Sequence, residues 1–160
     1  MGAGKGPLSK ESAGLLVYRL HDAEPEVLLV HPGGPFWKRR EDGAWSIPKG
    51  EIEQGEAAID VALREFREEL GQEAPAGDLV PLGSVRQAGG KVVHAWAVPG
   101  DIDPASVRSN AFEIEWPPRS GRKQSFPEVD KAGWFDLPTA RRLLLDAQRT
   151  FLDRLIQRIR

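Results

Sequence analysis

The chain has 160 residues, of which 40% are hydrophobic, and a formal net charge of −2. These values predict one domain with a real core over residues 11–160, after a flexible lead-in over residues 1–10. The chain has no cysteine, which excludes disulfides, thiolate zinc sites and a cysteine nucleophile. The lack of long apolar runs predicts no membrane partner, the negative charge predicts no stable nucleic-acid partner, and we expect a cytoplasmic protein.

Two apolar, β-branched runs come first along the chain. Residues 12–20 and 25–32 are separated by the turn-like HDAE, and together they predict a hairpin of buried strands. The next stretch, GGPFWKRREDG, combines glycines, Pro35 and mixed charges, and predicts a loop. Two interpretations of its aromatic residues Phe36 and Trp37 stay open: local packing, or a surface that stacks on a base.

A helix with two different faces is predicted within residues 50–71, which read GEIEQGEAAIDVALREFREELG. An i+4 apolar ridge forms its core face: Ala58, Ala62, Phe66 and Leu70. Gly71 fits the position that ends a helix. On another face, Glu65, Glu68 and Glu69 stack at i, i+3 and i+4. Because these like charges repel and a hard divalent cation would neutralise them, the pattern predicts a metal site.

The second half of the chain alternates strands and connections. Strands are predicted over residues 79–87 and 91–98, and a shorter one over residues 112–116, just before the segment PPRSGRKQSFPE. Residues 131–137 predict a last strand, and residues 137–160 one amphipathic helix. This order of elements predicts an α+β domain in which helices cover a mixed sheet.

The glycine and charged positions of the central segment resemble the Nudix box, the signature of Nudix hydrolases: Gly50, Glu56, Arg64, Glu65, Glu68, Glu69 and Gly71. One departure is Gln72, where the family usually has an aliphatic residue. The resemblance implies the Nudix fold, an α/β/α sandwich with the box as a loop–helix–loop at one end of a mixed sheet. It also implies an enzyme that hydrolyses a nucleoside diphosphate linked to another group, with Mg²⁺ as cofactor and Mn²⁺ as a substitute.

The same resemblance assigns roles around the metal. Glu68 and Glu69 would be the principal ligands, assisted by the backbone carbonyl of Lys49 or Gly50. Glu65, one turn earlier, would be a further ligand or the general base. Such carboxylates suit phosphoryl transfer because metal ions clamp the charge that develops on the phosphate oxygens.

Other residues are implied to support this site. Arg64 would orient the catalytic carboxylates by a charge-assisted hydrogen bond, while Glu56 and Gly71 would maintain the geometry of the loop and the helix. Many family members recruit one more acidic residue from a later strand or loop. Here Glu115 ranks first, because it ends an alternating strand; the other candidates are Glu113 and Glu128.

A nucleotide substrate needs cations for its phosphates and a surface for its base. We select Lys49, Arg86, Lys91 and Trp37 for these roles. The segments SAGLLVYR, WSIPKGEIEQGE and KVVHAWAV look more like the diadenosine tetraphosphate hydrolase branch than like sugar-nucleotide hydrolases, so a dinucleoside polyphosphate is the leading substrate. The alternatives are a pyrophosphatase for nucleoside triphosphates, including oxidised ones, and a nucleotide-sensing module without catalysis. A homodimer also stays open.

Overall fold

The structure, a computed structural model, describes residues 10–159. The predicted flexible lead-in lies outside this range, apart from Lys10. A mixed sheet contains the strands β1 (Glu11–His21), β2 (Glu24–Pro32), β3 (Lys49–Glu51), β4 (Val80–Arg86), β5 (Val92–Pro99) and β8 (Val129–Asp136). The helices are α1 (Ala58–Leu70), α2 (Leu137–Leu143) and α3 (Arg149–Ile159). None of these helices has the length and apolar character that a membrane span requires.

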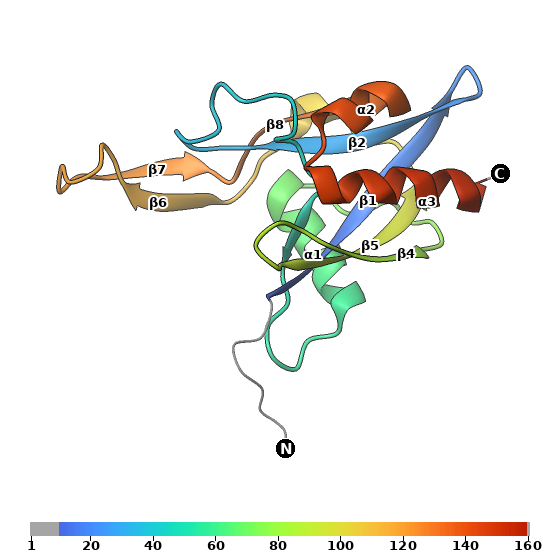
Figure 1. Ribbon diagram of the computed structural model, residues 1–160, viewed down its shortest axis with the longest axis horizontal. Helices are drawn as coiled ribbons and strands as arrows, with labels where there is room; N and C mark the ends of the chain where they lie inside the picture. Colours follow the sequence, from blue (N-terminus) through green and yellow to red (C-terminus); the bar gives the residue numbers. More distant parts are fainter. Residues whose placement is uncertain (1–9, 160) are drawn as a thin grey trace.

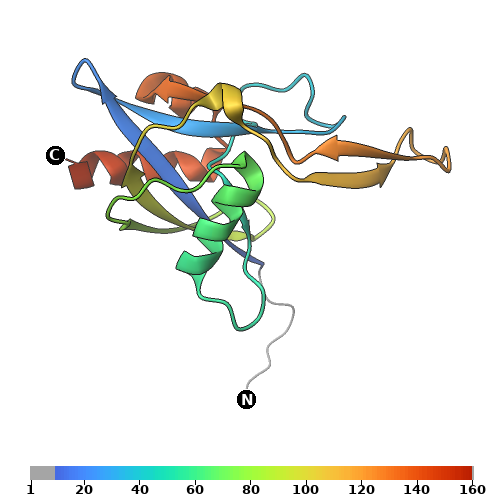
Figure 2. The ribbon, with the colours of Figure 1, turned by 180° about the vertical axis from the view of Figure 1, so that it is seen from behind.

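The sheet has the order β4-β5-β1-β2-β8 and separates two helical layers (Figures 1 and 2). Successive side chains of a strand point to opposite faces, so β1 supplies both halves of the core. Ala13, Leu15 and Val17 pack in the cluster that contains the apolar face of α1. Leu16 faces the other way, into the cluster formed with α2 and α3. The predicted α+β fold, a sandwich with helices on both faces, is confirmed.

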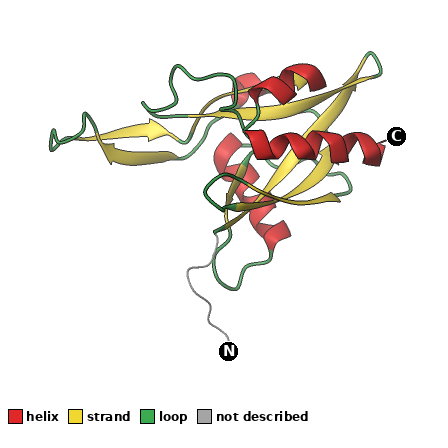
Figure 3. Ribbon diagram, viewed as in Figure 1, coloured by secondary structure: helices red, strands yellow, loops and turns green. Residues whose placement is uncertain are grey.

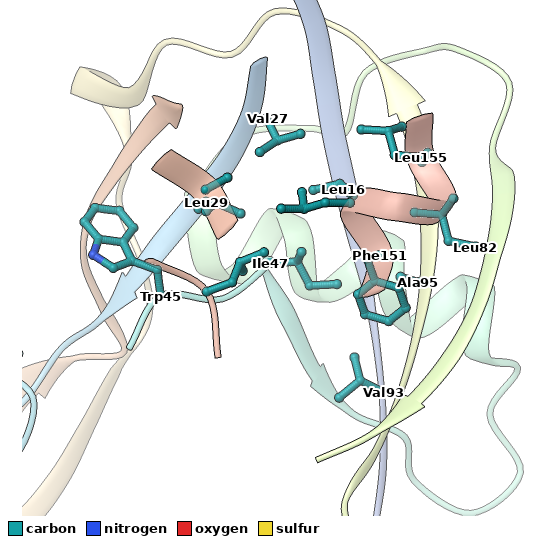
Figure 4. Close-up of a cluster of buried hydrophobic side chains, with 14 of the residues drawn as sticks. Leu16, Val27, Leu29, Trp45, Ile47, Leu82, Val93, Ala95, Phe151 and Leu155 are labelled. Carbon is teal, nitrogen blue, oxygen red and sulfur yellow. The ribbon is translucent and has the colours of Figure 1, made fainter. Parts of the chain in front are cut away.

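The core on the α3 side also fixes the chain that leads to β3. Trp45 and Ile47 come from this segment and pack with Leu16, Leu29 and Phe151 (Figure 4). Ile47 is fully buried, so it anchors a stretch that has little regular structure of its own. The neighbouring residues of this stretch are thereby held at a fixed place beside the sheet.

The edge of β1 that faces β2 is shared between two strands. The far end of β1 pairs with β2, from Tyr18 to His21, whereas Ser12 to Gly14 pair with β3. Where β1 and β2 diverge, the segment before β3 fills the opening: Ser46 bridges to β2, and the Pro48 carbonyl accepts a hydrogen bond from the Leu15 amide at 3.2 Å. This arrangement brings β3 against α1 in the middle of the molecule.

The predicted single C-terminal helix is wrong. The chain forms α2 and α3 instead, with extended backbone at Leu144 and Leu145 and a 3₁₀ turn over Asp146–Gln148 (Figure 3). Leu144 is fully buried and forms a bridge with Trp45. The Trp45 amide donates to the Leu143 carbonyl, and the Leu145 amide to the Trp45 carbonyl, both at 2.9 Å. This tertiary pairing outweighs the helix propensity of the leucines.

A second, two-stranded sheet projects from one end of the molecule (Figures 1 and 2). The predicted strand over residues 112–116 is present as β6 (Ala111–Glu115). It pairs with β7 (Lys123–Pro127), a strand that was not predicted from the sequence. The segment KQSFP lacks the apolar alternation of a half-buried strand and ends in proline, so its pairing depends on β6 rather than on a pattern of its own.

Candidate active site

Helix α1 lies against β3 so closely that position 50 has no room for a side chain. A Cβ atom on Gly50 would overlap the carboxyl group of Glu65. This close approach places Glu65 beside the backbone of Lys49 and Gly50, the two residues predicted to offer a carbonyl to a metal. At the other end of α1, Gly71 has a φ of 70° and its amide donates to the Arg67 carbonyl at 2.7 Å. The prediction that Gly71 ends the helix is therefore confirmed.

Arg64 connects the loop before α1 with the carboxylates on the helix. Its guanidinium donates to Glu56, lies 3.4 Å from Oε2 of Glu65, and lies 3.8 Å from Oε1 of Glu68. Glu56 in turn accepts a hydrogen bond from the Glu53 amide at 2.8 Å. The hydrogen bond from Arg64 lowers the pKa of Glu56, which keeps this residue ionised. Arg64 and Glu56 thus have the geometry to orient Glu65 and Glu68.

Glu69 and Lys49 form the inner part of the site. The Lys49 amide donates to Oε1 of Glu69 at 3.2 Å. Burial raises the pKa of Glu69, although the neighbouring Lys49 opposes this change. Burial also lowers the pKa of the Lys49 ammonium, and the positive charge of Lys91 lowers it further. The ionised form of Glu69 is therefore costly until a cation approaches it.

Glu128 completes the acidic group. It immediately precedes β8, and burial together with the charge of Glu68 raises its pKa. The charge of Glu128 contributes in turn to the raised pKa of Glu69. Glu115, which ranked first for this role, lies instead on the projecting sheet and accepts a hydrogen bond from the Gly121 amide at 2.7 Å. The structure therefore corrects the order of these candidates: the β6–β7 pairing carries Glu115 away, and Glu128 lies at the site.

A pocket of about 200 Å³ opens beside Glu69 and Glu128. Lys49 lies with these carboxylates, whereas most of the remaining wall is apolar. That wall consists of Val30, Pro32, Trp37, Ala44, Ser46, Ile47, Val129 and Leu145. Trp37, which was selected to bind the base, lines this pocket. The other wall residues carry no chemical signal in the sequence, because packing brings them together from separate segments.

Two predicted phosphate-binding residues occupy different surroundings. Lys91 influences the pKa of Lys49 and lies 3.9 Å from Glu51, so it belongs to the positive side of the site. Arg86 donates to the Gly90 carbonyl at 3.0 Å and lines a separate cavity with Gln87 and Leu145. The structure thus does not bring Arg86 to the carboxylates.

The carboxylates suit a hard divalent cation by their chemistry. Burial raises the pKa values of Glu65 and Glu128, and the neighbouring charge of Glu68 raises both of them further. Within residues 10–159, no group of three or more His, Asp or Glu side chains is already arranged as a metal site. Arg64 contacts Glu65 and Glu68, and the Lys49 amide contacts Glu69, so each of these carboxylates already has a partner within the protein.

Comparison with known proteins agrees with this geometry. The sequence profile of the NUDIX domain matches residues 10–158. The chain belongs to the Nudix hydrolase family. The predictions of this family and of its fold are therefore confirmed, and the match extends from the motif to almost all of the described chain.

Several individual Nudix proteins are similar to this chain. CTP pyrophosphohydrolase of Escherichia coli (strain K12) is 39% identical over 59 residues, which are 36% of this chain and only 43% of that protein. A Caenorhabditis elegans Ap4A hydrolase in a binary complex has a TM-score of 0.66 at 21% identity, covering 94% of this chain and 97% of the other. The NUDIX domain of Shewanella oneidensis NrtR, complexed with ADP ribose, has a TM-score of 0.64 at 18% identity, covering 97% and 91%. The two structural similarities concern the fold.

Proposed function

We propose that this Nudix protein hydrolyses a phosphoanhydride bond in a nucleoside-diphosphate-linked substrate and uses a divalent cation, Mg²⁺ or alternatively Mn²⁺. The observation that carries the proposal is the group of carboxylates beside a largely apolar pocket that also contains Lys49 and Trp37. Such a pocket can hold the flat base of a nucleotide, while the charged residues at one end contact the phosphates of the same nucleotide. A protein that only binds nucleotides would gain little from a group of carboxylates next to the phosphates, because the two carry like charges.

The residues divide the chemistry between them. Glu68 and Glu69 would hold the metal with Glu65 and Glu128 as further oxygen ligands. When bound, the ion would neutralise charge on the phosphate oxygens and lower the pKa of a coordinated water. Glu65 would accept the proton of the attacking water if it is not itself a ligand, and Lys49 would offer positive charge to the phosphate chain. Arg64 would keep the carboxylates in position through its contacts with them.

For the substrate, we propose a dinucleoside polyphosphate first. The sequence resemblance to the diadenosine tetraphosphate hydrolase branch supports this choice, and the structural similarity to an Ap4A hydrolase is compatible with it. A second candidate is a nucleoside triphosphate, including oxidised forms. The identity of 39% to CTP pyrophosphohydrolase, over 59 residues, favours that alternative.

A product-resolved hydrolysis screen tests the proposal. Wild-type protein with Mg²⁺ is offered diadenosine tetraphosphate, nucleoside triphosphates with their oxidised forms, and ADP-ribose. We expect ATP and AMP from diadenosine tetraphosphate. We also expect Glu69→Gln to lower turnover by at least about 100-fold, because the substitution removes a charged metal ligand.

The other outcomes are equally specific. Monophosphate and pyrophosphate from a triphosphate would select the second candidate. A Glu69→Gln protein with most of the wild-type turnover would contradict the assigned site. Nucleotide binding without hydrolysis of any of these substrates would contradict the enzyme and favour the sensing module.

A further inference from the structure

An aromatic pair lies on the surface where the loop after β2 meets the outer end of the projecting hairpin. Phe36 and Trp116 meet edge to face, with ring centroids 5.3 Å apart and an interplanar angle of 81°. Phe36 is 64% exposed, although it is a large apolar residue that packing would normally cover. The pair joins two segments that are far apart in the sequence, the loop after β2 and the end of β6. One ring therefore keeps much of its surface open to a ligand.

The β6–β7 hairpin presents its apolar side to this pair. Phe112 and Ile114 point to one face of β6, while Glu113 and Glu115 point to the other. Phe112 lies close to Gly34, so the loop after β2 runs along the apolar face. The acidic side chains of β6 are consequently directed to the other face of the strand, where the Glu115 carboxylate accepts a hydrogen bond from the Gly121 amide.

Three cations without ion-pair partners lie close to the aromatic pair in the sequence. Lys38 is two residues from Phe36, and Arg119 is three residues from Trp116. Arg122 is held beside Trp116, because its carbonyl accepts a hydrogen bond from the Trp116 amide at 2.9 Å. In the part of the chain that the structure covers, none of these three cations forms a salt bridge. Their charges are free to meet an anion.

One member of the aromatic pair, Phe36, is adjacent in sequence to a residue that lines the pocket. Trp37, which lines the pocket beside Lys49 and Glu69, follows Phe36 in the chain, so their Cα atoms are about 3.8 Å apart. A ligand whose phosphates lie at the carboxylates can therefore extend past Trp37 toward Phe36 and Trp116. The pocket of about 200 Å³ is too small for two nucleotides, so the second one needs another surface.

We propose that Phe36 and Trp116, together with Lys38, Arg119 and Arg122, form a second binding site for the distal nucleotide of a dinucleoside polyphosphate. The distal base stacks against the aromatic pair, and the cations contact the phosphates that join the two nucleotides. This inference rests on the proposed function and deepens it, because it explains how the site would distinguish a substrate with two bases from a mononucleotide.

Steady-state kinetics with Trp116→Ala test the second site. The KM for diadenosine tetraphosphate should rise by about 10-fold or more, the loss expected for one stacked base, with little change in kcat. The KM for ATP should change much less, because ATP has no distal base. Trp116→Phe should restore most of the affinity, since a stacking ring remains. Arg122→Glu should also raise the KM for the dinucleotide, and this effect should weaken at high salt.

Leu20 provides a matched control. It is also 64% exposed, but it lies near the β1–β2 turn at the opposite end of the molecule from the β6–β7 hairpin (Figure 1). Leu20→Ala should leave both KM values unchanged. Melting temperatures identify any variant whose hairpin is simply destabilised. Equal rises in KM for both substrates, or no rise for the dinucleotide, would overturn the second site.

Equilibrium binding separates this site from the proposed hydrolysis. Glu69→Gln protein is titrated with diadenosine tetraphosphate and with ATP, and tryptophan fluorescence is followed. Tighter binding of the dinucleotide that disappears in the Glu69→Gln, Trp116→Ala protein would support the second site even if wild-type protein hydrolyses neither ligand. Equal affinities for the two ligands would refute the second site, while hydrolysis by the wild-type protein could still stand.

Discussion

At position 50, the lack of a side chain decides where the carboxyl group of Glu65 lies. A Cβ atom there would overlap this carboxyl group, which is the far end of a flexible side chain. The backbone of Gly50 is not in the left-handed region, so another residue could adopt its conformation. The demand for glycine is therefore steric, and it comes from the position of the Glu65 side chain rather than from backbone strain.

Gly50→Ala should accordingly impair activity more than stability. The added methyl group should displace the Glu65 carboxylate, and we expect kcat to fall by about 10–100-fold, as for other changes that misplace a metal-site residue. The melting temperature should change little, because rotation of one side chain relieves the overlap. Gly43→Ala serves as a contrast: its φ of 72° is strained for alanine, but no atom lies near the added Cβ. That variant should lose stability and keep kcat.

The positions of some acidic residues could be predicted from the sequence, whereas the positions of others could not. Glu65, Glu68 and Glu69 could be predicted because a helix fixes their spacing, so that local geometry alone stacks them. Glu115 and Glu128 lie on elements whose positions depend on pairing between distant segments. The alternation of β6 was visible, but the projection of the β6–β7 sheet was not, and with it Glu115 leaves the site.

At the scale of elements, Gln148 joins the start of α3 to the chain before β3. It is fully buried, and its Oε1 accepts a hydrogen bond from the Ile47 amide at 3.0 Å. Its Nε2 donates to Oγ of Ser46 at 3.0 Å and to Oε1 of Gln87 at 2.8 Å. A single amide thus satisfies polar groups on two other segments, one of which continues directly to Lys49.

Gln148→Leu should therefore lower the free energy of unfolding by about 1–3 kcal/mol, because it leaves the buried Ile47 amide without a hydrogen-bond partner. Chemical denaturation measures this change. Gln87→Ala provides the comparison, since it removes one hydrogen bond at a half-buried position and should cost less. If Gln148→Leu were no less stable than Gln87→Ala, the connection between α3 and the segment before β3 would not support the fold.

The C-terminal elements show why helix periodicity was a poor guide there. The apolar pattern from Leu137 onward continues through Leu143, Leu144 and Leu145, and it gives no local signal for a break. The break arises from the backbone of Trp45, which pairs with this stretch from almost 100 positions earlier. By contrast, α1 was predictable because its apolar face and its terminal Gly71 are both encoded locally.

At the scale of the whole molecule, the order of elements predicted helices packed on a sheet. It did not predict which segments form the wall of the candidate pocket. Strands, a helix, further strands and a last helix indicated a mixed sheet covered by helices, and the family resemblance implied helices on both faces. The sharing of one edge of β1 between β2 and β3 is a long-range pairing, and so is the contact between the loop after β2 and the projecting hairpin. The candidate pocket lies among these segments, which explains why its charged helix face was predicted and most of its wall was not.

The carboxyl groups of Glu65, Glu69 and Glu128 should make the stability of the whole protein depend on pH. Burial raises the pKa of Glu69 to about 8 from an ordinary value of 4.5. Between these pH values the folded protein holds a proton that the unfolded chain has released. Without metal, the contribution of this group to the stability is complete below pH 4.5 and is lost as the pH rises through 8. The raised pKa values of Glu65 and Glu128 act in the same direction.

A divalent cation should oppose this loss, because an ion that bound the ionised carboxylates would favour the folded state. We expect millimolar Mg²⁺ to raise the melting temperature more at pH 8.5 than at pH 6, by about 2–4 °C for each kcal/mol of binding. Glu69→Gln should flatten the pH dependence of the metal-free protein, since its neutral amide needs no proton, and it should reduce the shift caused by Mg²⁺. A shift that is independent of pH and unchanged in Glu69→Gln would show that the cation binds elsewhere. In that case the stabilising charge would have to be sought outside the carboxylates of α1.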